Sequence, residues 1–141
     1  MDKRVVRALG LDVGDVRIGV AVSDSLGWTA QALKVITRAE LAKDLAEIKQ
    51  IIGEYDVEEL VVGLPKNMDG TLGSRAEKTM AFVDELKSEI DLPIVLWDER
   101  LSTVSATKAL LEADLSRRKR KEVVDKIAAV IILQGYLDAK R

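Results

Sequence analysis

Short runs of apolar residues, each ended by turn-forming residues, occupy the first quarter of the chain. Val5 to Asp12 is rich in apolar residues and stops at a Gly-Asp turn, and Arg17 to Ser23 alternates Ile and Val with small residues. A period of two is typical of a strand with one buried face, so the two runs predict a β-hairpin. A third, short strand is predicted for Leu33 to Thr37.

The apolar period then changes to that of a helix. Apolar residues recur every three or four positions, at Leu41, Leu45, Ile48 and Ile52. This spacing places them on one face of a helix, which we expect to run to about Gly53. Thr37-Arg38-Ala39-Glu40 has the spacing of a capping box and would mark the start of that helix.

Strands and helices alternate in the rest of the chain. Glu59 to Leu64 is a short apolar run closed by Pro65, and another apolar run covers Ile94 to Trp97. Both runs predict buried strands. Between them, Ser74 to Glu77 has capping-box spacing and predicts a helix to about Ile90. Two further helices are predicted, from about Ser102 to Glu112 and from Glu122 to Lys140.

The predicted order of elements is β-β-β-α-β-α-β-α-α. Three strands in a meander, followed by alternating helices and strands, predict an α/β fold with one five-stranded mixed sheet flanked by helices on both faces. A chain of 141 residues is long enough for one domain with one core, so we expect residues 1–141 to form a single domain. In such sheets, functional side chains gather at the carboxyl ends of the parallel strands.

Two absences from the composition limit the chemistry. The chain has no Cys, which excludes thiol catalysis, disulfides and Cys-ligated zinc, and it has no His, the usual general base. A metal ion would be held by oxygen ligands, which favours Mg²⁺ or Mn²⁺. No apolar run approaches the length of a membrane helix and no signal peptide is evident, so we expect a cytoplasmic protein.

Charge is unevenly spread along the chain. The net charge is −2, but Arg117-Arg118-Lys119-Arg120-Lys121 alone carries +5, which leaves −7 for the other residues. An acidic chain with one basic run predicts local contact with an anion, nucleic acid above all, although such runs are also typical of solvated loops. Aromatic residues make up only 4% of the chain, which argues against recognition by base stacking on aromatic rings.

Acidic residues occupy three places where a site is expected. Asp12 lies in the first predicted strand, Asp98 and Glu99 follow the fifth, and Asp125 lies near the start of the last helix. A carboxylate removed from water is costly unless a cation is paired with it, and clustered carboxylates raise one another's pKa unless a metal neutralises them. Singly, each has an ordinary explanation as a turn residue, a surface ion pair or a helix start. Together they favour a metal site.

Small residues accompany these acids. Gly10 and Gly14 are expected to clear side chains from around Asp12, so that a metal ion or a substrate can approach. Ala128 and Ala129 lie three and four positions after the acid of the last helix and share its helix face. They would let the helix backbone come close to the sheet.

Three further places could bind phosphate. The Gly- and Asn-rich loop Gly63–Gly70 contains Lys66 and leads to a helix N-terminus that carries Arg75. An ordinary connection capped by Ser74 explains this loop equally well. Arg100 could pair with a neighbouring carboxylate or bind phosphate through its planar guanidinium group.

Four segments, in this order and at these spacings, resemble a bacterial protein family. They are GLDVG at 10–14, GLP at 63–65, DERLST at 98–103 and DKIAA at 125–129. Together they resemble the YqgF family, also called RuvX-like, over nearly the whole chain. The resemblance implies an RNase H-like fold and a nuclease, described for this family as a Holliday junction resolvase and as a nuclease for the 5′ end of pre-16S rRNA. The implied partners are pre-rRNA or branched DNA and ribosomal precursor particles, bound by a monomer or a homodimer.

The resemblance also implies an acidic metal site for Mg²⁺ or Mn²⁺, built from Asp12, Asp98 or Glu99, and Asp125. We favour Glu99 over Asp98 because its longer side chain can reach back from the strand end. Two divalent ions about 4 Å apart can hydrolyse a phosphodiester without His or Cys. We expect Asp12 to bridge them, with Glu99 and Asp125 completing the two sites. The nucleic-acid backbone would be held by Lys66, Arg75, Arg100, Arg117, Arg118, Lys119, Arg120 and Lys121.

Two other functions fit parts of the sequence. Asp-x-Gly in a β-hairpin also resembles the phosphate loop of the ATPase group that includes sugar kinases and actin, but those proteins enclose ATP between two domains. A non-catalytic nucleic-acid-binding or ribosome-assembly factor could keep the acids as a structural Mg²⁺ site. Tight binding of ATP would favour the first alternative. Metal-dependent cleavage that is lost when Asp12 becomes asparagine would exclude the second.

Overall fold

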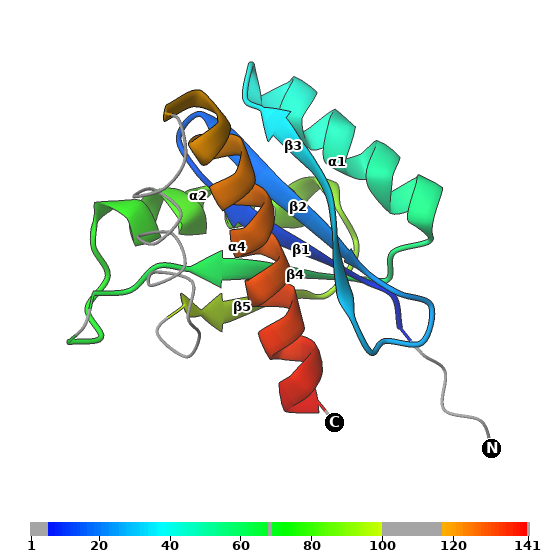
Figure 1. Ribbon diagram of the computed structural model, residues 1–141. Helices are drawn as coiled ribbons and strands as arrows, with labels where there is room; N and C mark the ends of the chain where they lie inside the picture. The colour runs from blue at the N-terminus through cyan, green and yellow to red at the C-terminus, as the bar shows by residue number, and fades with distance from the viewer. Residues whose placement is uncertain (1–5, 68, 100–116, 141) are drawn as a thin grey trace.

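A computed structural model describes residues 6–67, 69–99 and 117–140, with side chains in the last segment described from residue 124 on. Its strands form one five-stranded sheet in the order β3-β2-β1-β4-β5 (Figure 1). The strands are β1 (Ala8–Val13), β2 (Arg17–Ser23), β3 (Ala30–Thr37), β4 (Glu59–Leu64) and β5 (Ile94–Asp98). The helices in the described residues are α1 (Leu41–Tyr55), α2 (Ser74–Glu89) and α4 (Arg117–Lys140).

The sheet is mixed, as the sequence predicts. β1 pairs antiparallel with β2, and β2 pairs antiparallel with β3, which forms the predicted meander. β1 also pairs in parallel with β4, and β4 in parallel with β5. The carboxyl ends of β1, β4 and β5 therefore meet at one edge of the sheet, where functional side chains are expected. The helix predicted from about Ser102 to Glu112 lies outside the described residues.

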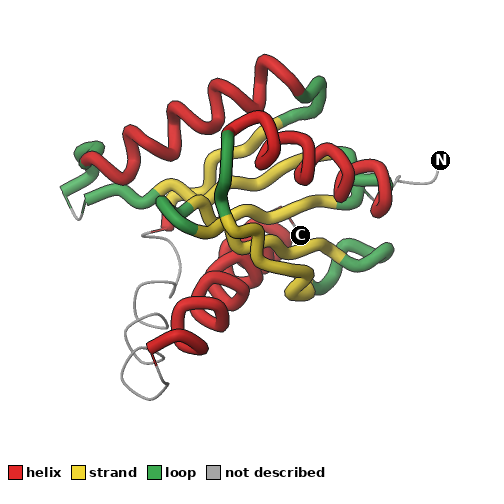
Figure 2. The backbone as a smooth tube through the Cα atoms, turned by 90° about the horizontal axis from the view of Figure 1, so that it is seen from above, coloured by secondary structure: helices red, strands yellow, loops and turns green. Residues whose placement is uncertain are grey.

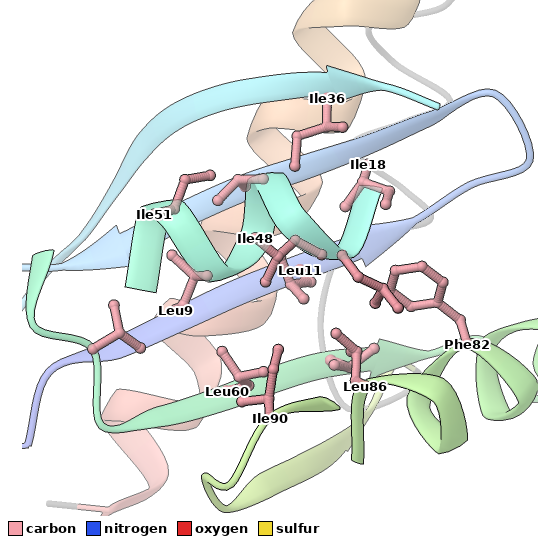
Figure 3. Close-up of a cluster of buried hydrophobic side chains, with 14 of the residues drawn as sticks. Leu9, Leu11, Ile18, Ile36, Ile48, Ile51, Leu60, Phe82, Leu86 and Ile90 are labelled. Atoms are coloured by element: carbon pink, nitrogen blue, oxygen red, sulfur yellow. The ribbon is translucent and has the colours of Figure 1, made fainter. Parts of the chain in front are cut away.

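Helices cover both faces of the sheet. α1 and α2 lie on one face and α4 crosses the other, as Figure 2 shows from above. The larger core lies between the sheet and the first two helices (Figure 3) and includes Leu9, Leu11, Ile18, Ile48, Phe82 and Leu86. Across the part of the chain that the structure describes, no helix combines the length and apolar character that a membrane crossing needs.

A second, smaller core lies between the sheet and α4. Its buried members come from both sides of this interface and include Ala8, Ala21, Val61, Ile132 and Leu133. Ala128 and Ala129 are also buried in this core, at 1% and 0% exposure. Their burial confirms the prediction that this face of the last helix approaches the sheet closely.

The starts of α1 and α2 differ from the predicted capping boxes. Thr37 is the last residue of β3, and the N-cap position of α1 is occupied by Glu40, without a side-chain hydrogen bond. Instead, the carboxylate of Asp44 in the first turn accepts a hydrogen bond of 3.0 Å from the backbone N–H of Ala39. α2 includes Ser74 as its first helical residue rather than as its cap. Both capping boxes are therefore wrong, although the helices that they marked are present.

The last helix begins earlier than predicted. α4 starts at Arg117 rather than Glu122, so the basic run lies in its first turns and not in a loop. Positive side chains are unfavourable at the positive end of a helix dipole, which is why the sequence favours a later start. Asp125 consequently lies more than two turns inside the helix and not near its start.

A buried carboxylate fixes the end of α4 to the sheet. Glu59, at the start of β4, is 8% exposed and accepts hydrogen bonds from the Tyr136 hydroxyl at 3.0 Å and from Lys140 at 3.1 Å. Partial burial, together with Glu59, raises the pKa of Tyr136 above its usual 10.0. Partial burial alone would lower the pKa of Lys140, but the hydrogen bond and charge of Glu59 outweigh it and raise that pKa as well.

Stability is expected to fall in alkaline solution because of this cluster. The protonated forms of Tyr136 and Lys140 are stabilised in the folded state, so their contribution is complete below about pH 10 and is lost as the pH rises through the folded-state pKa values. Replacing Glu59 by glutamine should lower the free energy of unfolding by about 1 kcal/mol or less near neutral pH, since the ion pair is partly exposed. Urea unfolding of both proteins at about pH 8 and about pH 11.5 measures this difference. A difference that does not shrink at the higher pH would contradict the prediction.

Candidate active site

Asp12 points toward α4 from the middle of the sheet. Successive residues of a strand point to opposite faces, and Leu9 and Leu11 pack under α1 and α2. Asp12 therefore lies on the other face, at the carboxyl end of β1. It is 6% exposed, so its carboxylate has little access to water. Such burial is costly unless the carboxylate is hydrogen-bonded, paired with a cation or bound to a metal.

Gly19 brings the backbone of Asp125 beside Asp12. In the antiparallel pairing of β1 and β2, Asp12 lies directly opposite Gly19. A methyl group added to Gly19 would overlap the carbonyl oxygen of Asp125. α4 thus crosses β2 in backbone contact, and the helix residue at this contact is an acid.

Gly63 brings Glu99 to the other side of Asp12. β1 and β4 pair in parallel, and continuing their register by one residue puts Asp12 beside Gly63. A methyl group added to Gly63 would lie 2.8 Å from Oε1 of Glu99 and would also overlap Ile132 of α4. Glu99, at 9% exposure, therefore lies on the α4 face as well.

Asp98 takes a different position from the acid that follows it. It is the last residue of β5, and its carboxylate lies 4.0 Å from the ammonium group of Lys66. Alternation along β5 puts Asp98 on the face covered by α1 and α2, where Ile94 and Leu96 pack. The two adjacent acids thus lie on opposite faces, and Glu99 is the one that shares a face with the other two acids.

Three acidic residues from three separate elements therefore lie at one edge and on one face of the sheet: Asp12, Glu99 and Asp125. Within residues 6–67, 69–99 and 117–140, no three acidic side chains are gathered closely enough to hold an ion as they stand. Like charges repel, which favours such separation. The donor set still fits Mg²⁺ or Mn²⁺, because both ions prefer carboxylate oxygens. The glycines on both sides of Asp12 let α4 and Glu99 come close to it, since neither neighbouring strand projects a side chain there.

Gly10 and Gly14, the glycines nearest to Asp12 in sequence, do not clear space beside its carboxylate, contrary to the prediction. Gly10 lies against α4, where an added methyl group would be 2.7 Å from Cβ of Leu133. Gly14 belongs to the turn between β1 and β2, where its N–H donates a hydrogen bond of 2.9 Å to the carbonyl of Arg17. The glycines that let other acids come close to Asp12 are Gly19 on β2 and Gly63 on β4, and only the strand register could have identified them.

The predicted phosphate-binding residues fall into two groups. Lys66 is half-buried beside Asp98, and Arg75 is exposed in the first turn of α2. Both lie near the carboxyl end of β4, at the same edge of the sheet as the acids. Arg100 and the side chains of residues 117–121 lie outside the described residues.

The loop between β4 and α2 satisfies several of its own backbone groups. The N–H of Asn67 donates to the carbonyl of Thr71 at 3.0 Å, and the N–H of Gly70 donates to the carbonyl of Asn67 at 2.9 Å. The N–H of Thr71 donates to Asp69 at 3.0 Å. Gly70 has a φ of 90°, which favours glycine. Because these N–H groups are engaged, Lys66 is the part of this loop best able to bind phosphate.

The sequence matches one protein family over almost its whole length. The RuvX family, described as "Holliday junction resolvase", matches residues 6–139. A relative from Desulforamulus reducens is 61% identical over 134 residues, which cover 95% of this chain and 98% of that protein. One from Clostridium tetani is 60% identical over 134 residues, covering 95% and 97%. Both relatives carry the name "Putative pre-16S rRNA nuclease".

Solved structures support the fold in an independent way. RuvC of T. thermophilus, in a complex with a Holliday junction, matches with a TM-score of 0.60 at 14% identity, over 96% of each chain. The Holliday junction resolvase of fowlpox virus matches with a TM-score of 0.55 at 10% identity, over 95% of this chain and 99% of the other. These likenesses confirm the RNase H-like fold that the sequence resemblance implies.

Proposed function

This chain belongs to the RuvX family, and from that premise we propose that it is a metal-dependent nuclease for the 5′ end of pre-16S rRNA. Its class, a hydrolase acting on phosphodiester bonds, follows from the family and from relatives named as nucleases. The proposal rests on the arrangement of Glu99 and Asp125 on either side of Asp12. Gly19 lies between Asp12 and Asp125, and Gly63 lies between Asp12 and Glu99. The substrate rests on the name of relatives that are about 60% identical along nearly their full length.

The three acids would hold two divalent ions. Asp12 occupies the central strand between the elements that carry Glu99 and Asp125, so it is the ligand best placed to serve both ions. When bound, such ions activate a water molecule and offset charge on the phosphate. Asp12 and Glu99 are both less than 10% exposed, and burial of this kind limits their side-chain motion and keeps bulk water out.

Basic groups around this edge would position the nucleic-acid backbone. Lys66 lies in the loop after β4 and Arg75 in the first turn of α2, the run 117–121 occupies the first turns of α4, and Arg100 follows Glu99 in the sequence. Five positive residues at the positive end of a helix dipole repel one another, and a phosphate backbone bound there would relieve that repulsion. Such contacts depend on salt and not on base sequence.

Residues 1–141 would act as one nuclease domain in the cytoplasm, on free pre-rRNA or on ribosomal precursor particles. One sheet contains all five described strands, which supports a single domain. A four-way DNA junction is the second candidate substrate, because the matched family is described as a Holliday junction resolvase. A junction has two-fold symmetry, so resolving one would favour a homodimer, whereas a monomer can trim RNA.

A cleavage assay with two substrates tests the proposal. The purified protein, with Mg²⁺ or Mn²⁺, is incubated with a 5′-extended pre-16S rRNA fragment and, separately, with a synthetic four-way junction. We expect the rRNA fragment to be cut in its 5′ extension, with the junction cut slowly or not at all. Faster, symmetric cutting of the junction would overturn the assignment of RNA as the substrate.

Variants of Asp98 and Glu99 test which of these two acids is the metal ligand. Changing Glu99 to glutamine should lower the cleavage rate at least about tenfold, because it removes a ligand charge from the α4 face. Changing Asp98 to asparagine should have a much smaller effect, because Asp98 faces Lys66 on the other side of the sheet. Equal losses in both variants would contradict the assignment of Glu99.

A further inference from the structure

A groove lies between α2 and the start of α1, beside the turn between β1 and β2, on the face of the sheet opposite to Asp12, Glu99 and Asp125. It has a volume of about 340 Å³, within the range of small-ligand sites. Its lining is part apolar and part charged: Asp15, Arg38, Leu41, Lys78, Ala81, Phe82 and Glu85. A narrow crevice continues it toward the end of β1 and adds Val13, Gly14, Arg75 and Thr79. The crevice therefore reaches β1 at Val13, the residue that follows Asp12.

Arg38 is held rigidly in the wall of this groove. It donates a hydrogen bond of 2.9 Å to the carbonyl of Gly14 and lies 3.4 Å from the carboxylate of Asp44. Its guanidinium group lies over the ring of Phe82, at 5.1 Å from the ring centre. The turn after β1, helix α1 and helix α2 thus each contribute one contact that holds the guanidinium group of Arg38 in place. Guanidinium planes of this kind are surfaces on which unpaired bases of RNA stack.

Lys78 supplies a second, more mobile cation. Its ammonium group lies 3.3 Å from Asp15, and the two side chains are 66% and 70% exposed. An ion pair this exposed contributes little in water, so Lys78 can exchange Asp15 for a phosphate group. Leu41, at 39% exposure, and the exposed Ala81 add an apolar strip beside the two cations. A planar cation, a mobile cation and an apolar strip together fit one nucleotide.

We propose that this groove binds a nucleotide of the substrate strand next to the cleavage position, with its base on Arg38 and its phosphate at Lys78. The inference rests on the proposed nuclease function and adds a second contact region to it. The strand would pass over the turn between β1 and β2, from the acids on one face to the groove on the other. Because the groove accepts one unpaired nucleotide, it would select single-stranded flanks over duplex ones.

Charge substitutions at Ala81 test the groove without touching the core. Ala81 and Ala46 are both exposed helical residues, but Ala46 lies outside the groove. We expect Ala81→Glu to weaken the binding of labelled single-stranded RNA about fivefold and Ala81→Lys to leave it unchanged or strengthen it. Ala46→Glu makes the same change in net charge and should match the wild type. Fluorescence anisotropy in metal-free buffer measures binding without cleavage, and melting curves verify the fold.

The outcomes separate this inference from the proposed function. If the wild type binds no RNA in this buffer and cleaves none when Mg²⁺ is added, both fail. If it binds none but cleaves with Mg²⁺, the groove inference alone fails. If it binds RNA but Ala81→Glu and Ala46→Glu behave alike, the groove inference fails and the nuclease proposal stands. Adenosine monophosphate is the second probe, since a free nucleotide shares this chemistry. If Ala81→Glu weakens the binding of adenosine monophosphate but not that of RNA, the groove takes a free ligand and the inference is overturned.

Discussion

Replacing Asp12 by asparagine is expected to lower cleavage by at least about two orders of magnitude and to leave the protein as stable as before, or more stable. The amide is nearly isosteric with the carboxylate but carries no charge, so it is a poor ligand for a hard cation. In metal-free buffer the same change removes repulsion from the other acids. The free energy of unfolding should therefore stay constant or rise by about 1 kcal/mol.

A cleavage assay and a melting curve, each with and without Mg²⁺, measure the two effects. Asp91→Asn is a matched control, since Asp91 is an exposed residue in the connection between α2 and β5. It should leave cleavage and melting temperature near those of the wild type. If Asp12→Asn melted at a lower temperature without metal and kept near-normal cleavage, Asp12 would be a structural residue and the catalytic assignment would fail.

Much of this fold can be read from the sequence because the apolar period differs between its elements. The sequence predicts a strand at Glu59–Leu64, where the structure has β4, and α1 and α2 occupy the predicted segments. The ends of elements were harder to predict. Thr37 continues β3 because it pairs with Arg17 of β2, and this tertiary pairing outweighs a local capping preference.

The face on which each acid lies could not be predicted in the same way. β5 is apolar at successive positions and packs on both sides, so its sequence has no alternation that reveals which way Asp98 and Glu99 point. The roles of Gly19 and Gly63 depend on the register of three strands and on where a helix crosses them. Neither quantity is a local property of the chain, and both emerge only when the sheet is assembled.

Replacing Gly19 by alanine is expected to cause a large loss of both stability and activity. The added methyl group would overlap the backbone carbonyl of Asp125, and a backbone atom cannot move aside as a flexible side chain can. α4 must shift away from β2, which disturbs the core formed by Ala128 and Ala129. Overpacking of this kind costs about 2–3 kcal/mol. Cleavage should fall at least about tenfold even below the melting temperature, because the shift moves Asp125 away from Asp12.

Gly53→Ala is the matched control for this prediction. Gly53 lies inside α1, and an added methyl group there meets no atom within 4 Å. Alanine is the better helix former, so this variant should gain about 0.5–1 kcal/mol in the free energy of unfolding and keep its full cleavage rate. Urea unfolding and cleavage assays on both variants therefore compare the same chemical change at a contact and in open space. If Gly19→Ala were as stable and as active as Gly53→Ala, α4 would not rest on β2 at Asp125, and the acidic site built on that contact would be wrong.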